Sequence, residues 1–161
     1  MTPAALELDF ERDFEFPPSI VFDALIEPDL ILGWLAEADV EPQLDGCYDL
    51  VWLTSSSYPP TQGMITALEE PELLEIETDN RGEISFRLSA LPGGPFGTTT
   101  RLVTTVRVAV DAAFVPRVKA DWLSNLDQLD GLLRGHPVDW ANWDRDRAEA
   151  WRGYLAAAGG R

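Results

Sequence analysis

The sequence predicts an α+β fold in which one long helix lies across a strongly curved antiparallel sheet. Two observations lead to this prediction. Short segments in which apolar and polar residues alternate, separated by turn sequences, fill most of the chain before residue 111. A single long segment with apolar residues at helical spacing follows at 115–135. We therefore expect a six-stranded sheet, two short helices after the first strand, the long helix and an extra C-terminal helix.

Residues 115–135 carry the clearest helical pattern. The apolar stripe consists of residues three or four positions apart, namely Val118, Trp122, Leu126, Leu129 and Leu133. Pro116 suits a first helical turn, where its missing N–H is not needed, and Gly135 suits a helix end. Polar residues fall largely on the other faces, so the stripe should face the sheet.

Six segments show the alternation expected of strands. They are 6–16, 47–53, 63–68, 73–78, 84–88 and 98–110. In the first segment apolar residues alternate with acids, except that Arg12 stands on the apolar side. Two short helices are predicted after this strand, at 20–26 and 30–35. Tight turns join the later strands, which should therefore be antiparallel neighbours.

The chain is strongly acidic. Its 161 residues include 28 acids against 12 lysines and arginines, which gives a formal net charge of −16. This charge repels phosphate backbones and anionic lipids, so we expect no nucleic-acid partner and no membrane partner. The acids form either a solubilising coat or, alternatively, a surface for a basic partner. The length fits one domain with its own core.

Isolated reactive residues indicate no site. Cys47 is the single cysteine, which excludes an internal disulfide and a thiol cluster for zinc. His136, the single histidine, lies in a turn without a second histidine or cysteine nearby. We therefore predict no metal site and no cofactor. The sequence shows neither a secretory signal pattern nor a stretch of membrane-spanning length, so we expect a cytoplasmic protein.

Four segments resemble, in order, the motifs of one family. They are FEFPPSIVFDAL at 14–25, EPDLILGWL at 27–35, GMITALEEPELLEIE at 63–77 and DWLSNLDQLDGLL at 121–133. They are similar to motifs of the START and Bet v 1-like superfamily, also called SRPBCC proteins, and within it of the group named after the activator of Hsp90 ATPase. The resemblance implies a helix-grip domain at 1–136 and a C-terminal helical extension at 137–161, packed on the domain or on a partner. The chain departs from the family pattern at Cys47 and Asp121, where glycine is frequent.

The resemblance also implies an apolar cavity between the curved sheet and the long helix. The residues expected to line it are Phe10, Arg12, Phe14, Tyr48, Trp52, Met64, Phe86, Leu88, Leu102, Thr104, Val106, Trp122, Leu126 and Leu129. Loops at Tyr58, Phe96 and Phe114 would rim its mouth together with the short helices. The alternative is an ordinary packed core with no usable void.

Two polar residues in this set invite a chemical interpretation. Arg12 could anchor a carboxylate or phosphate of a ligand, could be turned to solvent by a bulge, or could pair with a neighbouring acid. Tyr48 is the first tyrosine to consider if the cavity is an active site. The sequence has no nucleophile elbow, phosphate loop or dinucleotide fingerprint, and we predict no catalytic residues.

The C-terminal stretch predicts one further helix, capped by Asp139 and ending near Ala158. Its aromatic stripe consists of Trp140, Trp143, Trp151 and Tyr154. So large an aromatic surface is expected to be covered. The stripe either folds back on its own domain or forms a protein interface, most simply in a homodimer.

Three functions are consistent with these features. The favoured one is binding of an apolar or amphipathic small molecule, without catalysis. The second is a cyclase- or isomerase-like enzyme in the same cavity, because some helix-grip proteins are of that kind. The third is a protein-interaction module, either co-chaperone-like or a homodimer. The sequence does not identify the ligand.

Overall fold

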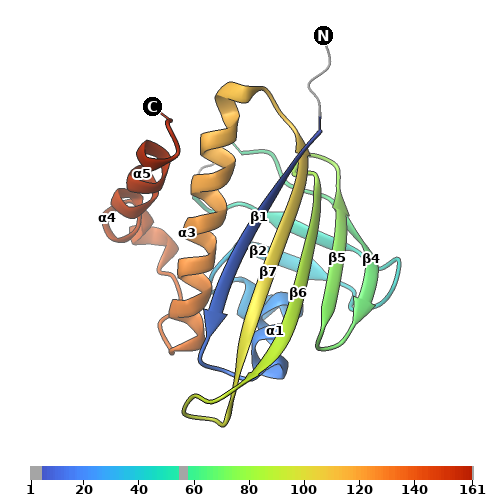
Figure 1. Cartoon of the computed structure of the whole chain (residues 1–161). Coiled ribbons are helices and arrows are strands. Elements are labelled where there is room, and N and C mark those ends of the chain that lie inside the picture. Colours follow the sequence, from blue (N-terminus) through green and yellow to red (C-terminus); the bar gives the residue numbers. More distant parts are fainter. Residues whose placement is uncertain (1–4, 55–57, 161) are drawn as a thin grey trace.

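A five-stranded antiparallel sheet forms the main layer of the computed structural model, which describes residues 5–54 and 58–160 (Figure 1). The strand order is β1–β7–β6–β5–β4. The strands are β1 (Ala5–Phe14), β4 (Gly63–Glu69), β5 (Leu73–Thr78), β6 (Glu83–Pro92) and β7 (Thr98–Ala109). Each predicted strand in this sheet is confirmed within a few residues at its ends.

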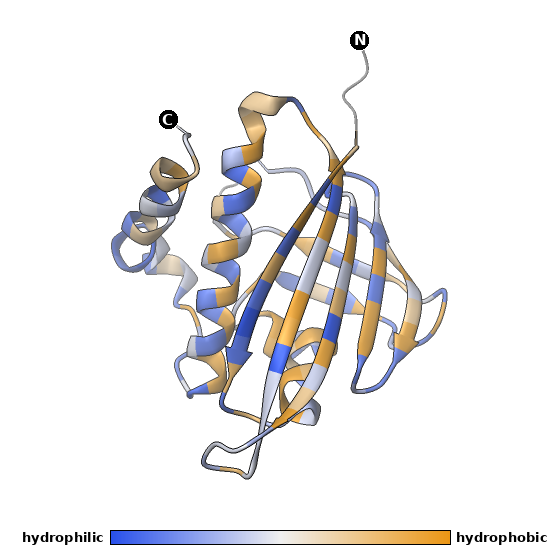
Figure 2. Cartoon of the chain, viewed as in Figure 1, coloured by the Kyte–Doolittle hydropathy of each residue, from blue (hydrophilic) through white to orange (hydrophobic). Residues whose placement is uncertain are grey.

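The pairing of β1 with β7 shows how the alternation in the sequence sets the two faces of the sheet. Phe10 stands opposite Thr104, and both side chains are buried. On the other face Asp13 pairs with Arg101 at 2.9 Å and Glu7 pairs with Arg107 at 3.1 Å. Figure 2 shows the resulting alternation of hydrophobic and hydrophilic residues along the strands. One face therefore carries the core, and the other is charged and exposed.

The predicted single six-stranded sheet is corrected in one region. Strand β3 (Tyr48–Val51) does not join the main ladder but pairs with β2 (Glu37–Val40) in a separate two-stranded sheet. Two isolated bridges, Cys47 to Met64 and Leu50 to Thr61, link this pair to the neighbourhood of β4. Strand β2 was not predicted, because its four residues are too few to show a period.

Three helices lie on the core side; two match their predicted bounds closely, whereas the helix predicted at 30–35 lies earlier, at Pro28–Ile31. They are α1 (Pro18–Ile26), α2 (Pro28–Ile31) and α3 (Val115–Leu133), and a short 3-10 turn, η1 (Ala112–Phe114), precedes α3. Proline occupies the first turn of each of the three, where its missing N–H costs nothing. Gly135, with a φ of 89°, ends α3 as expected. The buried side chains of α3 include Trp122, Leu126 and Leu129 from the predicted stripe.

The C-terminal segment is helical but not as one continuous helix, which corrects the prediction. It consists of η2 (Trp140–Asn142), α4 (Trp143–Asp146) and α5 (Ala148–Ala157). The break is at Arg147, whose φ of −128° departs from helical geometry. Asp139 does not cap the segment through its side chain, which instead accepts a hydrogen bond from Asn142. In Figure 1, α3 lies between the sheet and the helices α4 and α5.

Helix α5 packs against α3, and its Leu155 is buried. The extension therefore covers the face of α3 that is turned away from the sheet. Within the described residues, no helix has the length and apolar character that a bilayer crossing needs.

Candidate ligand cavity

A cavity of about 510 Å³ lies between α3, the main sheet and the two-stranded sheet. Its apolar wall consists of Leu35, Tyr48, Leu50, Trp52, Ile76, Ile84, Phe86, Val108, Val110, Phe114, Val118 and Trp122. Phe86 and Trp122 meet edge to face, with ring centroids 6.0 Å apart. The volume falls within the usual range for pockets that hold small molecules.

Four of the predicted lining residues do line this cavity: Tyr48, Trp52, Phe86 and Trp122. Eight others are buried but lie away from it in the packed core, which corrects the prediction. They are Phe10, Phe14, Leu88, Leu102, Thr104, Val106, Leu126 and Leu129. The reason is that α1 packs against β6, β7 and α3 and fills that part of the space. Inward-facing residues therefore form the packed core at one end of the sheet and the cavity wall at the other end.

Of Met64 and the three predicted rim residues, some line the cavity and others do not. Met64 is 41% exposed, because its neighbour Ile65 takes the inward position on β4. Tyr58 and Phe114 line the cavity as expected for rim residues. Phe96 does not line it and instead stacks on Phe16, with ring centroids 5.4 Å apart.

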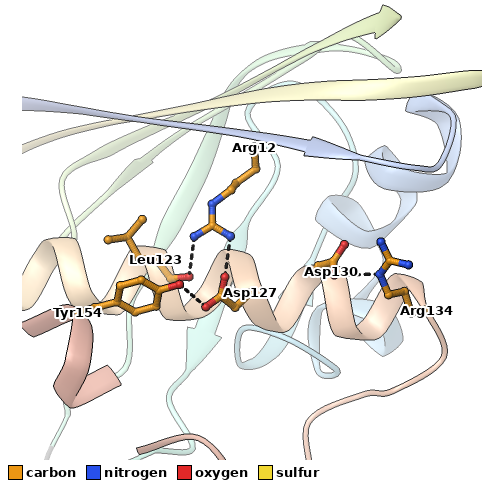
Figure 3. Close-up of polar contacts among 6 residues, drawn as sticks. All are labelled: Arg12, Leu123, Asp127, Asp130, Arg134 and Tyr154. Atoms are coloured by element: carbon orange, nitrogen blue, oxygen red, sulfur yellow. Dashed lines mark hydrogen bonds and ion pairs between the residues drawn. The ribbon is translucent and has the colours of Figure 1, made fainter. Parts of the chain in front are cut away.

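Arg12 lies outside the cavity and pairs with an acid, one of the alternatives that the sequence left open (Figure 3). Its Nη1 donates to Asp127 Oδ1 at 2.6 Å, and its Nη2 donates to the carbonyl of Leu123 at 3.5 Å. The hydroxyl of Tyr154 donates to the other oxygen of Asp127. Arg12 thus ties β1 to α3, and Tyr154 ties the C-terminal extension to the same carboxylate.

Tyr48 lines the cavity, but its hydroxyl is already engaged. The hydroxyl donates to the carbonyl of Leu25 at 2.6 Å. Burial raises the pKa of Tyr48 well above its ordinary value, so the hydroxyl keeps its proton at neutral pH. The group therefore fastens β3 to α1 and is poorly suited to proton transfer.

One end of the cavity is polar and charged. Arg81, in the turn between β5 and β6, lies over two aromatic rings, 4.2 Å from the Trp52 centroid and 5.4 Å from that of Tyr58. Its Nη1 is 3.7 Å from Oδ2 of Asp121 on α3. The turn requires glycine at position 82. Gly82 has a φ of 76°, and a Cβ there would lie 2.1 Å from the carbonyl oxygen of Arg107.

Burial affects both members of this pair. It lowers the pKa of Arg81, against the attraction of Asp121. It raises the pKa of Asp121, against the hydrogen bond from Trp151 and the attraction of Arg81 and Arg117. Neither residue was among the predicted site residues, because Arg81 was assigned to a turn and Asp121 to an outer helix face. The available signal was the aspartate at position 121, where the related family frequently has glycine.

The C-terminal extension forms the wall of a second, adjoining hollow of about 210 Å³. The residues that line both hollows are Leu35, Trp52, Thr54, Tyr58, Asp121 and Asn125. The extension adds Trp143, Asp144, Ala148, Trp151 and Arg152. The charged end of the cavity therefore continues toward the extension.

All four aromatic residues of the predicted interface bond to the chain itself. The indole N–H groups of Trp140, Trp143 and Trp151 donate to Leu32, Gln128 and Asp121 at 2.6, 2.9 and 2.7 Å. Tyr154 donates to Asp127, as described above. The aromatic stripe thus folds back on its own domain, and a homodimer through it remains a prediction.

Two residues considered for metal binding lie apart from the cavity. Cys47 lies beside Asp39 and Asp49, with the three potential ligand atoms within 4.8 Å of one another. The pairing of β2 with β3 creates this cluster, which the sequence alone did not indicate. His136 lies exposed in the turn after α3.

Comparison with known proteins places the chain in a family. The model of the activator of Hsp90 ATPase homolog 1-like proteins matches residues 15–134. Among curated proteins, none matches the chain significantly in sequence. The fold is that of CalU16 from Micromonospora echinospora, with 22% identity, coverage of 94% of this chain and 89% of that one, and a TM-score of 0.61.

Two further solved structures share the fold. EF2215 from Enterococcus faecalis is 19% identical, with coverage of 96% and 85% of the two chains and a TM-score of 0.69. The AHSA1-like protein from Aeromonas hydrophila is 21% identical, with coverage of 81% and 93% and a TM-score of 0.66. The family match and these likenesses confirm the resemblance and the fold class predicted from the sequence. The chain belongs to the family of activator of Hsp90 ATPase homolog 1-like proteins.

Proposed function

We propose that this protein binds a small amphipathic molecule in the cavity between α3 and the sheet. The observation that carries the proposal is the cavity of about 510 Å³, which has an aromatic and aliphatic wall and a charged end at Arg81 and Asp121. An apolar wall favours burial of a hydrophobic body, and a few convergent polar groups fix its orientation. Membership of the family fits a ligand-binding or interaction role but does not specify the ligand.

Native mass spectrometry of the freshly purified chain tests this function. We expect a non-covalent adduct of a few hundred daltons that is lost on denaturation. The variant Val110→Trp places a large ring at a position that lines the cavity and should fill part of its volume. Ala109→Trp places the same ring at the adjacent position, which is exposed. Val110→Trp should lose the adduct and Ala109→Trp should retain it. Equal adducts in both variants, or none in the unmodified chain, would contradict the proposal.

A proton-transfer enzyme in the same cavity is the second candidate. One observation favours it, the carboxyl of Asp121 in the cavity wall with its pKa raised by burial. The molecule extracted from the native complex should be altered after incubation with the unmodified chain, and unaltered with Asp121→Asn. If the molecule is recovered unchanged from incubation with either chain, the result would support binding without catalysis.

A further inference from the structure

We propose that the cavity selects amphipathic molecules with an anionic head, a carboxylate in particular, and that Arg81 binds this head. The inference rests on the function proposed above and specifies the class of ligand. It is drawn from the geometry of Arg81, the charges that line the cavity, and the fixed position of Asp121.

The guanidinium of Arg81 lies near two aromatic rings and one carboxylate. Trp52 and Tyr58 lie against the group at 4.2 and 5.4 Å from their ring centroids. The carboxylate of Asp121 is 3.7 Å away, beyond hydrogen-bond distance. Across residues 5–54 and 58–160, no oxygen accepts a hydrogen bond from this guanidinium. The side chain is only 28% exposed, so its donors are partly removed from water without a hydrogen-bond acceptor among the described residues.

A carboxylate is the group that best completes this arrangement. Its two oxygens match the spacing of two guanidinium N–H groups and form two parallel hydrogen bonds. The contacts with Trp52 and Tyr58 restrict the position of the guanidinium before a ligand arrives. Less conformational freedom is then lost on binding.

The charges around the cavity favour an anion despite the acidic chain. Among the described residues, the charged ones that line it are Arg81, Arg117 and Asp121, two cations and one acid. The whole chain carries −16. Asp121 is held by Trp151, whose indole N–H donates to Oδ1 at 2.7 Å. The charged end of the cavity thus offers Arg81 to a ligand on an otherwise negative molecule, and we expect it to favour an anionic head over a cationic one.

Isothermal titration calorimetry with matched probes tests the inference. The probes are decanoate, decanol and decylammonium, each below its aggregation concentration, with 2-naphthoate and 2-naphthalenemethanol as a rigid pair. The unmodified chain should bind each carboxylate about tenfold more tightly than the matching alcohol, because charge-assisted hydrogen bonds are the strong ones. Decylammonium should bind most weakly of the three decyl probes.

Variants of the protein distinguish recognition of the head group from binding of the apolar body in the cavity. Arg81→Gln should remove the preference for carboxylate and leave binding of the alcohols unchanged. Arg87→Gln is the matched control, because it removes the same charge from an exposed position on the adjoining strand, with a side chain that is 65% exposed. It should behave like the unmodified chain toward every probe. Circular dichroism establishes that each variant is folded, and Arg81→Lys should keep a weakened preference.

Two outcomes would overturn this inference while leaving the proposed function in place. One is an alcohol or amine that binds the unmodified chain as tightly as the carboxylate, and the other is a preference that survives Arg81→Gln. The comparison of heads on the unmodified chain is decisive even where a variant fails to fold. Failure of all probes together with the absence of a native adduct would overturn the proposed function itself.

Discussion

Asp121 is a cavity residue that is hydrogen-bonded to the C-terminal extension. Its Oδ1 accepts a hydrogen bond from Trp151 of α5, and its Oδ2 faces Arg81 of the β5–β6 turn. Neither neighbour lies close to it in the sequence. A single carboxylate therefore joins three parts of the chain, and its protonation affects both stability and the charge of the cavity.

The first prediction concerns the pH dependence that Asp121 contributes. Burial is the largest influence on its pKa and raises it, so the folded chain holds this proton to a higher pH than the unfolded chain. Stability from this group is then present at low pH and is lost as the pH rises from the unfolded toward the folded pKa. Asparagine carries no charge and keeps an oxygen for Trp151. Asp121→Asn should therefore gain free energy of unfolding relative to the unmodified chain as the pH rises above about 4, the ordinary pKa of an aspartate.

Urea denaturation at several pH values measures this difference. Asp144→Asn is the control, because it removes a carboxylate from an exposed position on α4. A stability difference for Asp121→Asn that stays constant with pH, or shrinks as the pH rises, would contradict the role assigned to this carboxylate.

The second prediction concerns the contact of Arg12, Asp127 and Tyr154 shown in Figure 3. Tyr154→Phe deletes the hydroxyl that donates to Asp127 and should lower the free energy of unfolding by about 1 kcal/mol. In an Asp127→Ala background the same change should cost less, because the acceptor is gone. Urea denaturation of the four chains completes the cycle. A loss of equal size in both backgrounds would show that the hydroxyl does not act through Asp127.

At the scale of elements, long periodic segments were predicted well and short ones were not. Helix α3 and strands β1 and β7 each have enough residues for their period to identify the buried face. Strand β2 has four residues, and only its pairing with β3 makes it a strand. The C-terminal segment has a helical stripe that runs through the break at Arg147, so the pattern predicted one helix where there are several.

The third prediction concerns the extension as a unit. Deleting residues 138–161 uncovers the face of α3 against which α5 packs and removes the buried Val138, Ala148 and Leu155. We expect a loss of several kcal/mol in free energy of unfolding, since each large apolar side chain contributes roughly 1.5–3 kcal/mol on burial. We also expect the shortened chain to self-associate, and the full chain to stay monomeric, in analytical ultracentrifugation.

A single substitution supports the same test without truncation. Leu155→Ala removes buried methyl groups and should cost about 2–5 kcal/mol, whereas Ala150→Ser on the exposed side of the same helix should cost little. A full-length dimer that becomes monomeric on deletion would instead assign the aromatic stripe to an interface between two chains.

At the scale of the whole molecule, the net charge of −16 opposes folding, because the compact state brings like charges together. The fourth prediction is that the melting temperature rises as sodium chloride is increased from about 10 mM to about 300 mM, where the screening length becomes shorter than most distances between acids. Glu70→Gln and Glu72→Gln, in the exposed turn before β5, should raise the melting temperature at low salt and weaken the response. A melting temperature that stays constant or falls with added salt would show that repulsion among the acids does not limit stability.

The location of the cavity could be predicted from the sequence, but the charged residues at its end could not. Family motifs indicated a cavity, and four lining residues could be named, because the inward faces of sheet and helix follow from periodicity. The charged end could not be predicted, since Arg81 comes from a turn, Asp121 from α3 and Trp151 from the segment beyond the family match. Such a site depends on tertiary contacts, which local patterns do not encode.

The pairing of β1 with β7 has a consequence for the chain during synthesis. Leu6 bonds opposite Val108, so the first strand emerges from the ribosome long before its partner exists. A bare strand of this kind is a template for pairing with another nascent chain. Here four acids, Glu7, Asp9, Glu11 and Asp13, occupy alternate positions along it. Two nascent chains would therefore repel each other until β7 is synthesised. Arg101 and Arg107 of β7 then pair with Glu7, Glu11 and Asp13 in the finished sheet.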